Sequence, residues 1–421
     1  MMFIELSDVS FAYGENVILQ ELSFKIHKGE FISIIGPNGA GKTTLLKLLS
    51  RVLKPEQGEI RLNGVDTQKI KRKELARIIG VVPQDSFIHF PFSVLDVVLM
   101  GRYPHLGNMA FERKEDLEIA KKVMILTDVF YLKERDINDL SGGERQRVII
   151  ARALAQEPEI LLLDEFASSL DLNHRIEIYD LIKKLNMERS LTIVNVSHDL
   201  NMASEYADRL LLLDRGTIHS IGKPKDVLTR DAIKDVFECN VLLEDSPVTG
   251  SPYIIPLHSN VKSEKEKRTL RIHIISGEGK GSVLLRRLFI RGFEITAGVL
   301  NIGDSDHMVG EALEIPMVLE RPFSMISDKA FLENLEKIKE ADLVILEKFS
   351  IGKGNIRNLE AALEGLKKGK EVLILDNEPG SDFTGGEAER LYDRIRENGG
   401  IFVKDHKELV KRLDRKINGV I

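Results

Sequence analysis

The chain has 421 residues, which is enough for two or three domains with separate cores. Its 66 acidic and 60 basic residues give a net charge of -6 and are mixed along the chain, so we expect no nucleic acid as a partner. The single cysteine, Cys239, excludes an internal disulfide and a cysteine-rich zinc site, which fits a reducing cytoplasm.

Neither a secretory signal nor a membrane span is expected. Residues 1–8 reach acidic side chains at once and lack a basic region followed by a long apolar core. We find no run of about 18 apolar residues, the length that a transmembrane helix needs. Any membrane role is therefore expected to be peripheral.

The first 34 residues alternate strand-like runs with turns and predict a β-rich N-terminal region, with strands at 3–6, 9–13 and 22–26. Tyr13 precedes a glycine, so its ring could pack in the core or stack on a base. Residue type alone favours the core.

The most informative stretch is Gly36-Pro-Asn-Gly-Ala-Gly-Lys-Thr-Thr44, which fits G-x-x-x-x-G-K-[ST] and lies between an apolar run and a helical pattern. Its glycines let backbone N–H groups turn toward a phosphate, and the helix N-terminus adds a positive dipole. Lys42 supplies a charge and Thr43 a hydroxyl for Mg²⁺. Chance produces this pattern in on the order of one chain in a hundred, so an ordinary glycine-rich turn is a weak alternative.

Polar side chains follow several apolar strands further along the chain. Gln84 ends the run 78–84 and is a candidate metal or water contact, Asp164 and Glu165 end the run 160–165, and His198 follows the run 192–196. Between them, residues of about 87–150 look mostly helical. Ser141 is placed to cap a helix within the stretch Leu-Ser-Gly-Gly-Glu-Arg-Gln-Arg, which predicts a second anion-binding helix start.

These motifs, with Ser169-Leu-Asp171, occur in the order found in the ATP-binding cassette ATPase family, which residues of about 1–240 resemble. The resemblance implies ATP and Mg²⁺ as cofactors, with the catalytic residues Glu165, which polarises the attacking water, and His198, which contacts the γ-phosphate. It implies Mg²⁺ contacts from Thr43, Gln84 and Asp164. The implied ATP-binding residues are Tyr13, stacked on adenine, with Asn38, Gly39, Gly41, Lys42, Thr43 and Thr44.

The same resemblance implies a head-to-tail homodimer. Ser141, Gly142, Gly143 and Glu144 form the signature that contacts the partner's nucleotide, and Asp171 belongs to a loop at the dimer interface. The chain has Phe166-Ala167 where most members have Pro-Thr, but neither usual residue is catalytic.

Met100-Gly-Arg-Tyr-Pro-His-Leu106 is similar to cassettes that energise import of iron–siderophore, haem and cobalamin complexes. The implied partners are integral membrane permease subunits and, indirectly, an extracytoplasmic substrate-binding protein, with the chain at the cytoplasmic face of the membrane. The alternative is a soluble cassette ATPase of DNA repair or translation. Long coiled coils, zinc cysteines or a second cassette would favour it, and none is found in the sequence.

The fold class expected is α/β: a cassette domain over 1–260 with a P-loop core sheet, an antiparallel N-terminal part and a helical insert, a linker at 261–268, and a smaller Rossmann-like domain over 269–421. The second domain shows strand-like runs at 270–275, 293–300, 343–346, 372–375 and 401–403, mostly separated by helical stretches, which predicts a doubly wound parallel sheet.

The first turn of this second domain, Ser276–Gly281, imitates a dinucleotide fingerprint. The imitation is incomplete, because the third glycine falls one place early and Asn301 stands where an acid should bind ribose. Three readings stay open: NAD binding, a structural or dimerising domain, and a small-ligand site that regulates the cassette. The candidate ligand residues are Gly277, Gly279, Gly281, Asn301 and Asp304.

Overall fold

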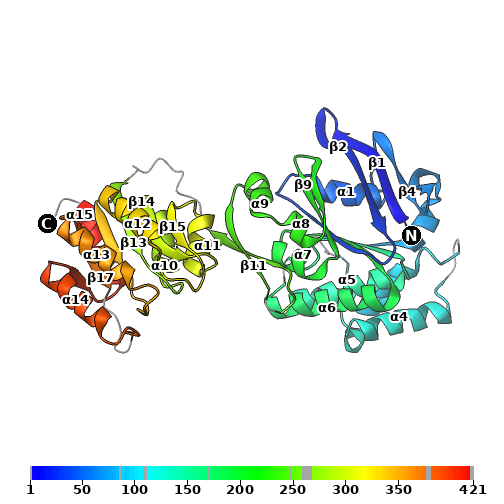
Figure 1. The fold of residues 1–421 in the computed structure, drawn as a ribbon. Coiled ribbons are helices and arrows are strands. Elements are labelled where there is room, and N and C mark those ends of the chain that lie inside the picture. Colours follow the sequence, from blue (N-terminus) through cyan, green and yellow to red (C-terminus); the bar gives the residue numbers. More distant parts are fainter. Residues whose placement is uncertain are drawn as a thin grey trace. The chain divides into compact units, whose positions relative to one another are not determined.

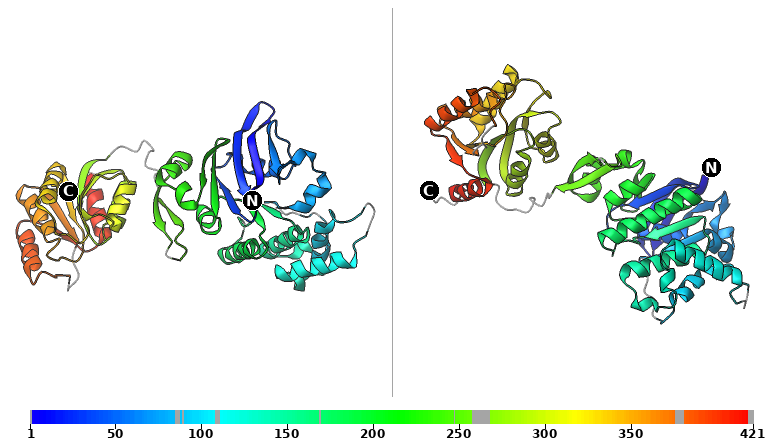
Figure 2. Two further views of the ribbon diagram at one scale, coloured as in Figure 1. Left: turned by 45° about the vertical axis from the view of Figure 1, so that its right-hand side comes forward. Right: turned by 90° about the horizontal axis from the view of Figure 1, so that it is seen from below.

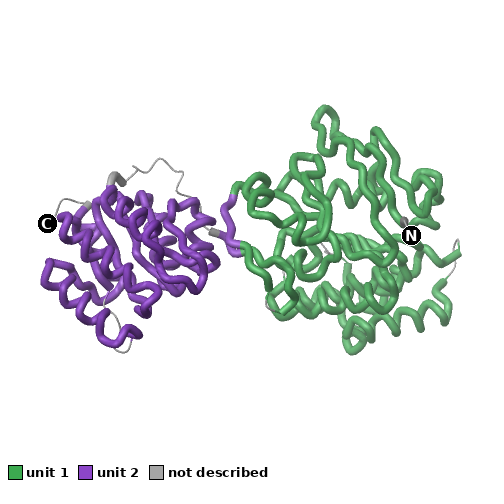
Figure 3. Tube along the Cα trace, in the orientation of Figure 1, with its two compact units in different colours: residues 1–238, 243–254 green, residues 239–242, 255–421 purple. Residues whose placement is uncertain are grey.

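A computed structural model describes residues 2–84, 88, 90–107, 111–168, 170–246, 248–257, 268–375 and 381–417. Ser169 and nearly all of the expected linker lie outside these residues. The chain divides into two compact units, shown in Figure 3: residues 1–238 with 243–254, and residues 239–242 with 255–421. The domain boundaries at 260 and 269 stay a prediction. No helix among the described residues is long and apolar enough to cross a membrane.

The first unit begins with an antiparallel sheet of order β2-β1-β4-β5 (Figure 1). The two strands expected at 3–6 and 9–13 are one continuous strand, because a register shift between Leu6 and Val9, where Asp8 has φ +50°, absorbs the break in the apolar alternation. The sheet consists of β1 (Met2–Tyr13), β2 (Asn16–His27), β4 (Gln57–Leu62) and β5 (Val65–Asp66).

The central sheet of this unit has the order β10-β9-β3-β8-β7-β6, with β10 alone antiparallel to its neighbour among the described strands. Its middle strands are buried on both faces and mostly apolar, as strands covered by helices require. One core joins it to the antiparallel sheet. The strands are β3 (Phe31–Ile35), β6 (Ile79–Val82), β7 (Ile160–Asp164), β8 (Thr192–Val196), β9 (Arg209–Asp214) and β10 (Thr217–Gly222).

The helical insert expected at 87–150 contains α3 (Val94–Leu99), α4 (Lys114–Leu126) and the start of α5 (Gly142–Ala155). A capping box begins α3, because Ser93 and Asp96 bind each other's backbone N–H groups. Figure 2 shows these helices from two further directions. The unit's other helices are α1 (Lys42–Leu49), α2 (Arg72–Ile78), α6 (Leu172–Arg189), α7 (Leu200–Tyr206), α8 (Pro224–Val227) and α9 (Arg230–Phe237). β11 (Asn240–Asp245) and β12 (Pro252–Leu257) form a two-stranded sheet.

The second unit contains a parallel sheet of order β15-β14-β13-β16-β17-β18, which is the doubly wound order expected of a Rossmann-like fold. The strands are β13 (Arg268–Ile275), β14 (Phe293–Asn301), β15 (Met317–Glu320), β16 (Leu343–Leu346), β17 (Glu371–Leu375) and β18 (Ile401–Val403). The sequence analysis missed β15, because its four residues carry too little apolar alternation to be recognised.

Helices cover both faces of this second sheet, over two separate apolar cores. In chain order they are α10 (Ser282–Ile290), α11 (Ser305–Ala312), α12 (Asp328–Glu340), α13 (Arg357–Lys367), α14 (Glu387–Glu397) and α15 (His406–Ile417). The order reverses between β13 and β16, so the carboxyl ends of these two strands lie at the point where open α/β sheets bind ligands.

Candidate functional site

The loop between β3 and α1 has the backbone that a phosphate cradle needs. Gly39 and Gly41 have φ of +82° and +99°, values that disfavour any residue with a side chain. A Cβ atom on Gly36 would lie 2.1 Å from the carbonyl oxygen of Leu213. No side chain caps the first turn of α1, so its N–H groups remain available to an anion.

Lys42 is folded over this loop. Its Nζ donates to the carbonyl oxygens of Gly36 and Pro37 at 2.8 and 2.9 Å, and the residue is buried. Burial lowers the pKa of the Lys42 ammonium, while the charges of Glu165 and Asp164 act in the opposite direction. The loop is thus closed around a cation near two carboxylates.

Asp164 ends β7 and lies next to the loop helix. Its Oδ1 accepts a hydrogen bond from Thr43 Oγ1 at 3.2 Å. Burial raises the pKa of Asp164, against the stabilising bond from Thr43. A hydroxyl and a carboxylate in contact are hard oxygen donors, which are the ligands that Mg²⁺ prefers. The residues present therefore fit a magnesium ion.

Glu165 lies between side chains from the two neighbouring strands. Gln84, just after β6, donates from Nε2 to Glu165 Oε2 at 2.7 Å, and His198, after β8, contacts Glu165 Oε1 through Nε2. Glu165 has φ +47°, and its N–H donates to the carbonyl of Val196. Gln84 and His198 are 81 and 33 positions from Glu165 in the sequence, and the structure brings all three together.

The loop, Glu165 and His198 border a cavity of about 240 Å³, whose described lining does not include Gln84 or Asp164. It is lined by Ile18, Asn38, Gly39, Gly41, Lys42, Thr43, Thr44, Glu165 and His198. The sequence analysis missed Ile18, since nothing in an ordinary strand residue marks it as close to the loop. Tyr13 does not line this cavity. The expectation from residue type that Tyr13 is a core residue was wrong, because its side chain is 49% exposed and only packs edge-on against Phe11.

The predicted signature residues lie outside this cavity. Ser141 caps α5 in a capping box: its Oγ accepts from Glu144 N at 3.3 Å and donates to the Glu144 carboxylate at 2.8 Å. A Cβ atom on Gly142 would meet nothing within 4 Å, whereas one on Gly143 would lie 3.2 Å from the ring of His174. Asp171 caps α6 and binds His174. Signature and Asp171 loop are therefore neighbours, and the described residues around the cavity do not include them.

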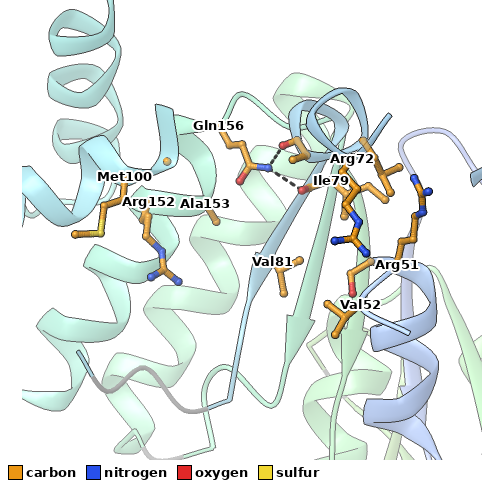
Figure 4. A pocket seen from close by; sticks show the side chains of 13 residues that line it. Arg51, Val52, Arg72, Ile79, Val81, Met100, Arg152, Ala153 and Gln156 are labelled. Carbon is orange, nitrogen blue, oxygen red and sulfur yellow. Dashed lines mark hydrogen bonds between the residues drawn. The ribbon is translucent and has the colours of Figure 1, made fainter. Parts of the chain in front are cut away.

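A second hollow of about 580 Å³ separates β6 from the helical insert (Figure 4). Met100 and Arg152 lie on one side of it and Arg51 and Arg72 on the other, with Val81 of β6 between them. Gln156, at the end of α5, donates to the carbonyl oxygens of Ala76 and Ile79 and so ties α5 to β6. We refer to this hollow as the arginine groove.

The second unit has a cavity of about 680 Å³ at the carboxyl ends of β13, β14 and β16. Of the five candidate ligand residues, Gly277, Asn301 and Asp304 line it. Gly279 and Gly281 do not, because both pack against the chain itself: a Cβ atom on them would lie 3.2 Å from Ser305 and 2.3 Å from Ser276 Oγ.

The loop with its lysine, the acids at the next strand end and the convergent glutamine and histidine define a P-loop nucleoside triphosphatase. Residues 19–168 match the ABC transporter family, and residues 295–410 match the MJ0874 family. The cobalamin import ATP-binding protein BtuD of Halobacterium salinarum is 32% identical over 359 residues, 85% of this chain and 89% of BtuD. The chain therefore belongs to the ATP-binding proteins of the ABC transporter family, and it hydrolyses ATP.

Two further similarities cover the first unit. The ferric enterobactin transport ATP-binding protein FepC of Escherichia coli is 40% identical over 249 residues, 59% of this chain and 92% of FepC. An inward-facing ABC transporter of the metal-chelate type aligns with a TM-score of 0.55 at 31% identity, over 62% of this chain and 99% of that one. The match to BtuD, by contrast, is longer than the first unit and so extends into the second.

Proposed function

We propose that this chain is the ATP-hydrolysing subunit of an importer for a metal complex, acting at the cytoplasmic face of the membrane on a separate permease. The observation that carries this proposal is the convergence of Gln84, Glu165 and His198 beside the loop, in a chain whose relatives are named for cobalamin and ferric enterobactin transport. A cobalamin-type cargo is favoured over an iron–siderophore or haem, because the BtuD match includes part of the second unit.

The geometry supports a division of roles in hydrolysis. The loop amides and Lys42 would bind the β- and γ-phosphates, and Thr43, Asp164 and Gln84 would hold Mg²⁺, which neutralises phosphate charge. Glu165 would orient the attacking water, since its carboxylate is fixed by two partners at the edge of the cavity. His198 is 41% exposed at its side chain and would reach the γ-phosphate from the far side of Glu165.

We further propose a head-to-tail homodimer. Ser141, Gly142, Gly143 and Asp171 are presented away from the chain's own cavity, so that they would complete the site of a second copy. A partner's phosphate could then approach Gly142, where a Cβ atom would meet no other part of the chain within 4 Å.

The arginine groove is the proposed docking site of the permease. Its described lining residues include Arg51, Arg72 and Arg152 but no acid, so it suits a short permease segment that carries carboxylates. The groove touches both β6, which leads to Gln84, and α5, which begins at the signature. Occupation of the groove can thus be transmitted to both parts of the ATP site. An extracytoplasmic binding protein would act only through the permease.

A mixing experiment tests the dimer. Ser141→Arg spoils the signature but leaves the loop intact, and Lys42→Ala does the reverse, so each variant alone should hydrolyse ATP poorly. A mixed dimer contains one complete site, and the 1:1 mixture should therefore exceed both parents in phosphate release. A mixture no more active than the mean of its parents, or a fully active Ser141→Arg chain, would contradict the pairing.

Uptake measurements test the cargo and the docking site. Cells that lack the gene should lose uptake of labelled cobalamin more than uptake of a ferric siderophore, and the wild-type gene should restore it. Arg72→Glu, a change of an exposed side chain, should abolish restoration while purified protein keeps its ATPase rate. Unaltered cobalamin uptake in the deletion strain would refute the cargo.

A further inference from the structure

The cavity of the second unit lies where the strand order reverses, but the phosphate position beside it is already filled. Asp306 Oδ2 accepts from Gly281 N at 3.1 Å and Oδ1 accepts from Ser282 Oγ at 2.7 Å, at the first residues of α10. Asp306 is fully buried. The helix N-terminus, which in a dinucleotide-binding fold receives the pyrophosphate, is therefore occupied by the chain's own carboxylate.

The charge of the cavity also disfavours phosphate. Its described lining includes the acids Glu278 and Asp304 but no lysine, arginine or histidine. Glu278 is fixed at the edge by a hydrogen bond from Ser350 N at 3.1 Å. Burial raises the pKa of Asp304, which is what a carboxyl withdrawn from water next to other acids shows. An anion would meet repulsion here, whereas a neutral or cationic molecule would not.

Two buried polar side chains line the cavity, and one of them has no hydrogen-bond partner among the described residues. Ser276 is fully buried, and its Oγ has no partner among the described residues. Asn358 also lines the cavity and is 2% exposed, and its Oδ1 accepts from Val299 N at 3.3 Å. A buried polar group without a partner is costly, so the Ser276 hydroxyl favours a ligand that carries hydroxyl or amide groups.

The rim of the cavity presents apolar side chains to water. Phe323 and Phe383 are 105% and 70% exposed, and Met325 is 68% exposed. Phe323 has φ +57°, a strained value for an aromatic residue, and Glu320 holds the loop at both ends by accepting from Arg321 N at 3.0 Å and Ser327 N at 2.9 Å. An exposed ring held by a strained backbone offers a surface on which the ring of a ligand can stack.

We propose that this cavity binds a phosphate-free ring compound, neutral or cationic, which stacks on the exposed phenylalanines and bonds through hydroxyl or amide groups to Ser276 and Asn358. Its volume of about 680 Å³ lies within the range of small-molecule sites. Two sources share this chemistry. One is a nucleoside, and the other, which alone rests on the proposed cargo, is a corrinoid without its phosphate-bridged nucleotide.

Calorimetric titration of the full chain tests this. A Lys42→Ala background suppresses nucleotide binding in the first unit, and the probes are adenosine, AMP, cobinamide and cobalamin. Adenosine or cobinamide should bind, and its phosphate-containing counterpart should bind at least about tenfold more weakly. Which of the two binds identifies the source.

Two exposed aromatic residues and one matched control locate the site. Phe323→Ala and Phe383→Ala should each weaken binding about tenfold, since stacking is lost. Leu332→Ala changes an exposed apolar side chain of α12 outside the cavity and should leave binding unchanged. The proposal is overturned if no probe binds, if the phosphate-free probe that binds is matched in affinity by its phosphate-containing counterpart, or if neither phenylalanine variant differs from Leu332→Ala. None of these results bears on ATP hydrolysis or uptake.

Discussion

Each unit of this chain has a glycine-rich turn between its first parallel strand and the following helix. The first turn leaves its helix N-terminus open to a phosphate, and the second does not. In residues 36–41 the helix N-terminus is left uncapped and a lysine closes over the loop. At the turn 276–281, Asp306 binds the Gly281 amide and the hydroxyl of the following Ser282, and the nearby Lys280 is exposed and makes no such closure. Glycine spacing sets the backbone path, but phosphate binding also needs free N–H groups and a cation.

The largest expected effect concerns chemistry in the first unit. Glu165→Gln should slow ATP hydrolysis by about 10²–10⁴-fold while ATP still binds, because an amide cannot accept a proton from the attacking water. Phosphate release under saturating ATP measures it. The control is Glu159→Gln. Glu159 immediately precedes β7, is exposed and pairs with Lys28, so its substitution should leave the rate of hydrolysis unaltered. A Glu165→Gln rate within a few fold of wild type would show that another group orients the water.

The next effect compares the lysines of the two turns. Lys42→Ala should weaken ATP binding by about 10- to 100-fold, because a charge-assisted contact to the phosphates is lost. Lys280→Ala should leave the affinity for ATP unchanged, since its turn is already filled by Asp306. Titration calorimetry on both variants measures the contrast. Equal losses from the two substitutions would mean that both turns bind phosphate.

A smaller effect is expected on stability in the second unit. Asp306→Asn should lower its free energy of unfolding by about 1–3 kcal/mol, because an amide nitrogen cannot accept from Gly281 N or Ser282 Oγ and leaves one of them unpaired. Asp328→Asn, which removes an exposed partner of Arg357, is the matched control and should cost less than about 1 kcal/mol. Denaturant melts of both variants compare the losses in free energy of unfolding. Equal losses would mean that the hydrogen bonds of Asp306 contribute no more to stability than an exposed ion pair.

The smallest effect is a pH dependence confined to the second unit. His273 is fully buried, and burial lowers its pKa to about 4, against a bond to Asn334 that raises it. The unfolded histidine titrates near 6.5, so the unfolded chain binds more protons between these values and stability falls as the pH drops through this window. At pH 5 the second unit should lose about 2 kcal/mol relative to pH 7.5. Denaturant melts that show a flat profile would contradict a buried neutral histidine.

Much of the fold and the placement of the strand-end residues could be predicted from the sequence, because Gln84, Asp164, Glu165 and His198 each follow an apolar run typical of a buried strand, while their roles were implied by the family resemblance. Parallel strands end at one edge, which is why Gln84, Asp164, Glu165 and His198 meet. Ile18 could not be predicted in this way, since its proximity to Gly41 depends on how the antiparallel sheet packs against the loop.

The second unit was less predictable for a related reason. Its glycine pattern predicted a ligand site at the strand ends. Asp306, which fills the helix N-terminus, is 25 positions from Gly281, and in the sequence nothing distinguishes it from a surface aspartate. The exposed rings of Phe323 and Phe383 lie in loops without periodicity, so no pattern could reveal that they border one cavity.

Helix α5 connects the arginine groove with the signature. It has 14 residues and is about 21 Å long; Gln156 pins its far end to β6, and Ser141 caps its near end. A tilt of about 10° around the pinned end moves Ser141 by about 4 Å, more than the length of a hydrogen bond. A tilt of α5 caused at the arginine groove would therefore be larger at the signature, in proportion to the length of the helix.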